Sequence, residues 1–172
     1  MENKPTPAWL IALITSLILI ILSILIYVTD QLTNKYFSYL YNGLILIVII
    51  WACIHYAKQM NGDVTYGNVF AHGFKVTAGI AAIMAVYSFL SIKFIHPELI
   101  EKTIDAVRTE MEKNPKLSND DIDRFTNISR KFFIPGAIGG TLFNNGFVGL
   151  IGSLIGAAIA RKNPVTPFDK PV

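Results

Sequence analysis

The stretch "AWLIALITSLILIILSILIYV", residues 8–28, decides the fold class because it carries no charged side chain over its whole length. A helix needs about 20 apolar residues to cross the roughly 30 Å hydrocarbon core of a bilayer. Inside that core every backbone N–H and C=O must be satisfied within the protein, which favours a helix over any open structure. We therefore predict that residues 8–28 form a membrane-spanning helix.

Three further apolar runs of similar length follow, at 40–57, 70–95 and 133–160. The 172-residue chain is 52% hydrophobic and 16% charged, and its length is typical of one domain. We predict an all-α fold, an integral membrane four-helix bundle that forms a single membrane domain over residues 1–172. The first run exceeds the ~7–15 apolar residues of a signal peptide, and no A-x-A site follows it, so we interpret it as a retained helix.

Residues 96–132 differ because charges of both signs alternate with apolar residues there. Apolar residues recur at helical spacing in two parts, separated by Asn114-Pro115: Ile100, Ile104, Val107 and Met111, then Ile122, Phe125, Ile128 and Phe132. Ser118, with Asp121 three residues on, predicts a capping box at the start of the second part. We expect two amphipathic surface helices between the third and fourth transmembrane helices.

Local signals also mark the ends of the predicted helices. Asn61-Gly62 predicts a tight turn between the second and third spans, and Thr65 predicts an N-cap that starts the third span near Tyr66. His96-Pro97 predicts an interruption after the third span.

Small residues dominate the last apolar run. In lipid, helices associate through close packing and interhelical hydrogen bonds, and both favour small side chains at the interface. Small-xxx-small spacing predicts two packing ridges, at Gly152, Gly156 and Ala160 and at Gly149, Ser153 and Ala157. These ridges serve either the interior of one copy, packing the third and fourth spans together, or a dimer.

Two polar groups lie at membrane depth. Asn144 and Asn145 occupy the fourth run, and an amide there is costly unless it is paired, so we expect one of them to bond a neighbouring helix. His55 and His72 should lie at similar depth around the Asn61-Gly62 turn, with Lys75 one turn deeper on nearly the same face as His72. They are interpreted either as interface residues or as a polar cluster that binds an anionic headgroup or relays protons.

The sequence contains none of the patterns that usually carry catalysis or metal binding. It has no G-x-S-x-G, Walker A, G-x-G-x-x-G or H-E-x-x-H motif, and Cys53 is its single cysteine. Two neighbouring histidines without a third ligand fall short of a zinc site. We therefore expect no enzyme activity, no cofactor and no metal site.

The basic residues indicate a membrane partner. The net charge is +3, but lysines and arginines flank the apolar runs and do not interleave with exposed aromatic residues. This distribution favours a lipid bilayer over nucleic acid. The lysine and arginine counts do not decide the orientation. The acids number three on the side of the termini against nine on the other side, which favours termini in the cytoplasm.

Three segments resemble one known family. "TYGNVFAHG" (65–73), "IHPELIE" (95–101) and "GLIGSLIGAAIARK" (149–162) are similar to the bacterial membrane proteins of domain-of-unknown-function family 4199, over about residues 8–163. The resemblance implies a multi-pass protein of the bacterial inner membrane, with cytoplasmic termini and a periplasmic segment at 96–132. It implies no activity, and Ala71 stands where the family usually has lysine.

Two functional hypotheses follow. The first is a non-enzymatic scaffold or subunit that acts through contacts with lipid, with a protein partner or with another copy of itself. The alternative is a small transporter or permeation subunit, in which Asn144, Asn145, His72 and Lys75 would line a common polar path.

Overall fold

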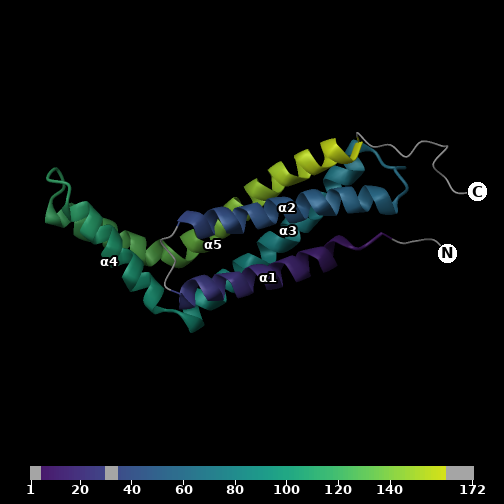
Figure 1. The fold of residues 1–172 in the computed structure, drawn as a ribbon. Helices are drawn as coiled ribbons and strands as arrows, with labels where there is room; N and C mark the ends of the chain where they lie inside the picture. Colours follow the sequence, from purple (N-terminus) through teal and green to yellow (C-terminus); the bar gives the residue numbers. More distant parts are fainter. Residues whose placement is uncertain (1–4, 30–34, 162–172) are drawn as a thin grey trace, which may run out of the picture. The chain divides into compact units, whose positions relative to one another are not determined.

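The structure, a computed structural model, describes residues 5–29 and 35–161 of the chain. These residues form helices and contain no strand. The elements in order are α1 (Ala8–Val28), α2 (Lys35–Gln59), α3 (Tyr66–Leu90), the π-helix η1 (Ser91–Ile95), α4 (Glu98–Glu112) and α5 (Asn119–Arg161) (Figure 1). The predicted all-α class is confirmed.

Four helical segments are long and apolar enough to cross a membrane: Ala8–Val28, Tyr36–Gln59, Tyr66–Ile95 and Asn119–Ala160. Large apolar side chains such as Leu17, Ile47 and Val86 lie on their outer surfaces, where contact with lipid carries no desolvation cost. These helices indicate a multi-pass membrane protein, as the apolar runs predict.

The described structure divides into two compact units. Unit 1 comprises Met1–Met84 and Phe143–Val172, and unit 2 comprises Ala85–Leu142. Helices α3 and α5 therefore each contribute one part to unit 1 and the other part to unit 2.

Unit 1 is a bundle of α1, α2 and the adjoining parts of α3 and α5. The side chains of Tyr41 on α2 and Asn145 on α5 meet near the start of α2, and Cys53 lies against Gly156 near its end. These two contacts, far apart along both helices, show that α2 and α5 run parallel. Helix α1 approaches α3 closely, because a Cβ added at Gly79 would lie 2.6 Å from the Cβ of Ala12.

The α2–α3 turn uses the signals that the sequence carries. Asn61 and Gly62 both have positive φ, at 53° and 74°, and the Gly62 N–H donates to the Ala57 carbonyl oxygen over 3.0 Å. This hydrogen bond spans six residues and is the 6→1 bond of a Schellman motif at a helix C-terminus. Thr65 Oγ1 then accepts from the Asn68 N–H at 3.2 Å, so both the turn and the N-cap of α3 are confirmed.

Helix α3 continues into η1, and the helical structure ends before His96. The His96 N–H donates to the Ser91 carbonyl over 2.7 Å, which is the spacing of a π-turn. Lys93 Nζ lies 5.3 Å and 5.5 Å from the ring centroids of Phe89 and Phe94, within cation–π range. The predicted interruption at His96-Pro97 is confirmed.

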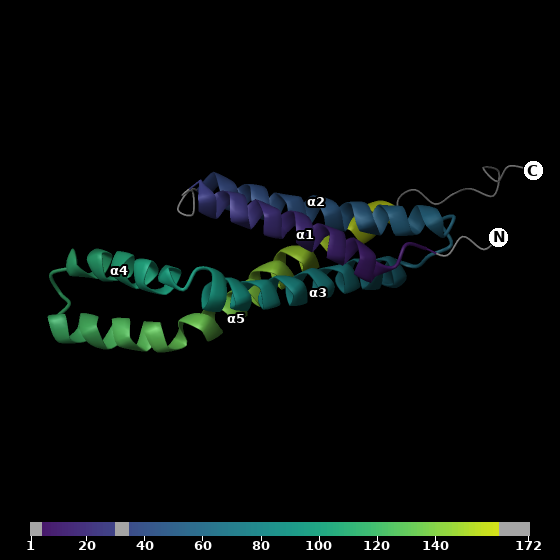
Figure 2. The same ribbon diagram turned by 90° about the horizontal axis from the view of Figure 1, so that it is seen from below.

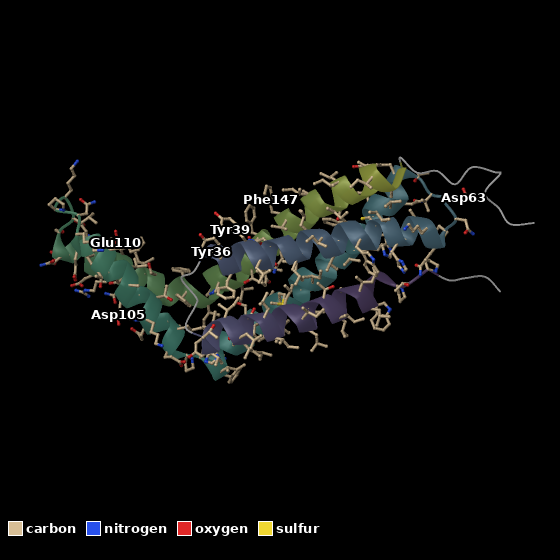
Figure 3. All side chains as sticks on the ribbon, viewed as in Figure 1. Tyr36, Tyr39, Asp63, Asp105, Glu110 and Phe147 are labelled. Carbon is tan, nitrogen blue, oxygen red and sulfur yellow. The ribbon has the colours of Figure 1, made fainter. Side chains whose placement is uncertain are left out.

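In unit 2, α4 and the first part of α5 form an antiparallel hairpin (Figure 2). Ile104 on α4 and Ile122 and Thr126 on α5 are buried between the two helices. The Arg130 guanidinium donates two bonds to the Glu101 carboxylate at 2.9 and 2.7 Å, and Arg108 pairs with Asp123 at 2.8 Å. In Figure 3, Asp105 and Glu110 project from α4 into the surroundings.

The prediction of two separate surface helices is not supported. Helix α4 is amphipathic and separate, but the second amphipathic segment is the start of α5, which runs without a break from Asn119 to Arg161 with Pro135 inside it. The capping box is present, since Ser118 and Asp121 bond each other's backbone N–H groups at 3.3 and 3.2 Å. A proline costs one helical hydrogen bond, but ending the helix beside an apolar run would leave several backbone groups without partners. The helix therefore continues through Pro135.

Candidate functional site

Small residues pack closely in unit 1 where α2, α3 and α5 meet. A Cβ added at Gly73 on α3 would lie 2.5 Å from Cys53 Sγ and 2.9 Å from Ser153 Oγ. Thr77 Oγ1 and Ser153 Oγ lie 3.5 Å apart, and each hydroxyl also donates to a carbonyl one turn earlier in its own helix. We call Cys53, Gly73, Thr77, Ser153 and Gly156 the seam.

The predicted packing residues all lie on α5, and most of them are buried in this region. Gly149 lies against Thr77 of α3, Gly152 lies against Ile49 of α2, and Gly156 lies against Cys53 and Ile50 of α2. Ser153 and Ala157 are also buried, and Ala160 packs partly buried beside Ala157. The sequence suggested contact with the third span, whereas the structure adds the close approach of α2.

Asn144 and Asn145 both bond α2, as their position at membrane depth predicts for at least one of them. The Tyr41 hydroxyl donates to Asn145 Oδ1 over 3.2 Å, and Asn144 Nδ2 donates to Asn42 Oδ1 over 3.0 Å. Asn145 is only 1% exposed, and its Nδ2 has no hydrogen-bond partner in the described part of the chain. Tyr41 therefore turns inward, whereas Tyr36 and Tyr39, like Phe147, lie on the outer surface (Figure 3).

Two of the three histidines, His55 and His72, lie on aromatic rings near the α2–α3 turn. The His72 ring stacks on Tyr56 with centroids 4.3 Å apart, which joins α3 to α2, and the His55 ring stacks on Trp51 at 4.8 Å. Lys75 is exposed, and both Lys75 and His55 lie near enough to His72 to interact with it electrostatically. Within residues 5–29 and 35–161 neither imidazole has a hydrogen bond.

The asparagine group (Asn144 and Asn145) and the histidine group (His55, His72 and Lys75) are far apart. Tyr41 and Tyr56, which contact Asn145 and His72, are separated by about 22 Å along α2 at 1.5 Å per residue. Between them α2 buries Ile45, Ile49 and Cys53 completely. These three side chains lie in the interior of unit 1 between the two groups.

The Cys53 thiol is buried, lies 3.7 Å from the Val69 carbonyl oxygen, and belongs to an apolar cluster with Ala57, Val69 and Ala157. No group of three or more His, Cys, Asp or Glu residues able to hold a metal occurs among the residues that the structure describes.

The model of a family described as proteins of unknown function (DUF4199) matches residues 10–162, which is most of the chain. The chain belongs to this family. The predicted resemblance to this family is thereby confirmed. Neither the curated proteins nor the solved structures contain a match to this chain.

Several residues of the seam and its surroundings were not predicted as packing residues from the sequence. Gly73 and Thr77 are four residues apart, a small-xxx-small pair that the sequence does display, continued by Ala81. Tyr41 and Tyr56 gave no such signal, because tyrosine near a span end is also typical of the outer aromatic belt.

Proposed function

We propose that this protein is a non-enzymatic membrane scaffold or subunit, which holds the α4–α5 hairpin outside the bilayer on a rigid bundle. One observation supports the proposal: the seam packs α2, α3 and α5 closely at a level between the two polar groups, which argues against a common path. Added Cβ atoms at Gly73 and Gly156 would come within 2.5 and 2.7 Å of Cys53 atoms, so these backbones already lie against the Cys53 side chain.

The α4–α5 hairpin is the element that we propose to make contacts outside the bilayer. Two arginine–carboxylate pairs, Arg130–Glu101 and Arg108–Asp123, join its helices. The Arg130 hydrogen bonds lower the pKa of Glu101, and the hydrogen bond to Glu112 together with the charge of Asp123 raises the pKa of Arg108. The pairs therefore stay ionised over the physiological range and link α4 to the first part of α5.

The placement in the cell is part of the proposal. We place the protein in the bacterial inner membrane, with its termini in the cytoplasm and the hairpin in the periplasm. Its partners are then the bilayer itself and a protein partner or a second copy, and not nucleic acid. The smaller number of acids on the side of the termini, three against nine on the other side, supports this placement.

The native cysteine tests the closed interior. In sealed proteoliposomes we expect Cys53 to resist a charged methanethiosulfonate reagent applied from either side, and to react fully once the protein is unfolded in detergent. The matched control is Asn61→Cys in a Cys53→Ala background, which places the thiol in the exposed turn and should react at once. Reaction of Cys53 in the folded protein at a rate near that of the control would favour the transporter hypothesis.

A further inference from the structure

The unit 2 part of α5 presents an apolar stripe that no described residue covers. Phe125, Ile128 and Phe132 are 49%, 60% and 58% exposed. Their spacing of three and four residues places them on one side of the helix. The residues that pack against α4 are Ile122 and Thr126, so the hairpin's own core does not use the stripe.

Basic side chains flank the stripe. Arg124 and Lys131, seven residues apart, lie on one edge of it, and Lys131 Nζ lies 5.9 Å from the Phe132 ring centroid. Neither cation has an ion-pair partner among the described residues, whereas Asp121 and Asp123 are engaged in the capping box and with Arg108. An apolar stripe with free cations at its edge complements the interface of an anionic bilayer.

The size and position of the stripe favour lipid over a second copy. Three side chains about half exposed offer roughly 300 Å², well below the ~800 Å² per partner of a stable protein interface. The apolar run that enters the membrane begins at Phe133, directly after the stripe, so the chain itself holds the stripe near the bilayer. Pro135 interrupts the hydrogen bonds of α5 just beyond, which permits a bend there.

We propose that the first part of α5 lies against the bilayer surface, with Phe125, Ile128 and Phe132 among the lipids and with Arg124 and Lys131 on anionic headgroups. This inference rests on the proposed function, because it specifies what the hairpin contacts. The hairpin is then an element held parallel to the membrane that presents α4 to the aqueous side.

Spin labels on the full chain test the proposal. In a Cys53→Ala background, nitroxides are attached at Ile128→Cys and, as a matched control on another face of α5, at Asn127→Cys. Accessibility to oxygen and to a water-soluble nickel complex is then measured in vesicles of phosphatidylcholine with one part in four phosphatidylglycerol. We expect the label at 128 to contact oxygen severalfold more than nickel, and the label at 127 to show the reverse.

Two results would overturn the inference. Equal access of nickel to both labels would place the stripe in water. Shielding of position 128 from both reagents, lost when the protein is diluted with excess lipid, would make a second copy the occupant. Both results leave the Cys53 experiment unaffected, so failure here is distinguishable from failure of the proposed function. Arg124→Gln with Lys131→Gln should reduce the oxygen preference at 128 in anionic vesicles and leave it unchanged in pure phosphatidylcholine, and an equal effect in both would refute the role of the cations.

Discussion

Replacing Gly156 with leucine should destabilise the bundle by forcing α2 and α5 apart. Even the first carbon of the new side chain would lie 2.7 Å from Cys53 Cβ and 3.1 Å from the backbone Cα of Ile50. Carbon atoms pack best at about 3.5–4.0 Å, so the helices must separate by roughly 1 Å at this point. A backbone atom cannot rotate away as a side chain can.

The magnitude follows from the weaker dispersion attraction between the separated helices. A gap of 0.5–1 Å forfeits about a quarter to a half of the attraction of each atom pair, and a buried interface the size of one leucine holds about 40 such pairs at ~0.15 kcal/mol each. The loss is then about 1.5–3 kcal/mol, which agrees with the usual cost of overpacking a core, about 1–3 kcal/mol. The better helix propensity of leucine returns roughly 0.5–1 kcal/mol. We expect a net loss of about 1–2 kcal/mol, a fall of roughly 2–8 °C in the apparent melting temperature for a chain of this size.

The assay uses a fluorogenic maleimide that reacts with Cys53 when the seam opens on heating in detergent. Gly146→Leu is the matched control, because Gly146 lies on the same helix and an added Cβ would meet nothing within 4 Å. This control should melt at the parent temperature or slightly above it. A Gly156→Leu variant as stable as the parent, or a control that loses as much stability, would refute the packing of the seam.

Three smaller predictions concern the hairpin and the buried amide. Ser118→Ala removes the capping box and should cost about 1 kcal/mol, seen as faster trypsin cleavage in the first turns of α5, and unchanged cleavage would contradict it. Arg130→Gln should raise the pKa of Glu101 towards its ordinary value of 4.5, as followed by NMR titration. The stabilisation from this pair is present above the ordinary pKa and is lost as the pH falls through the lower folded value, so a variant with the parent pH profile would refute it. Tyr41→Phe removes the bond to Asn145 and should cost about 0.6 kcal/mol, a typical value inside a membrane, and no loss in thermal melting would show that the bond contributes nothing.

The sequence predicts the spans and their ends well because local chemistry decides both. The Asn61-Gly62 turn, the Thr65 cap and the Ser118–Asp121 box all depend on residues within a few positions of one another. Length and polarity suffice to place the spans, since a bilayer imposes a fixed thickness.

Features that depend on contacts between distant residues were not predicted from the sequence. Pro135 is a helix breaker by local rules, yet the apolar surroundings keep α5 continuous through it. The inward turn of Tyr41 depends on Asn145, about a hundred positions along the chain, and the stacking of His72 on Tyr56 depends on how α2 and α3 pack. The small-residue spacing on α5 indicated close packing but not that α2 would be among its partners.

The most direct test of the central claim, that α3 crosses the bilayer between the α2–α3 turn and the hairpin, is labelling from one side. Single cysteines at Asn61 and Lys116, both in a Cys53→Ala background, are exposed to an impermeant maleimide in sealed vesicles of uniform orientation. In the sealed vesicles we predict that one position reacts directly and that the other reacts only after lysis. In intact cells we predict that the cysteine at Lys116 lies on the outer side. Equal reaction of both positions in sealed vesicles would contradict the membrane-spanning bundle.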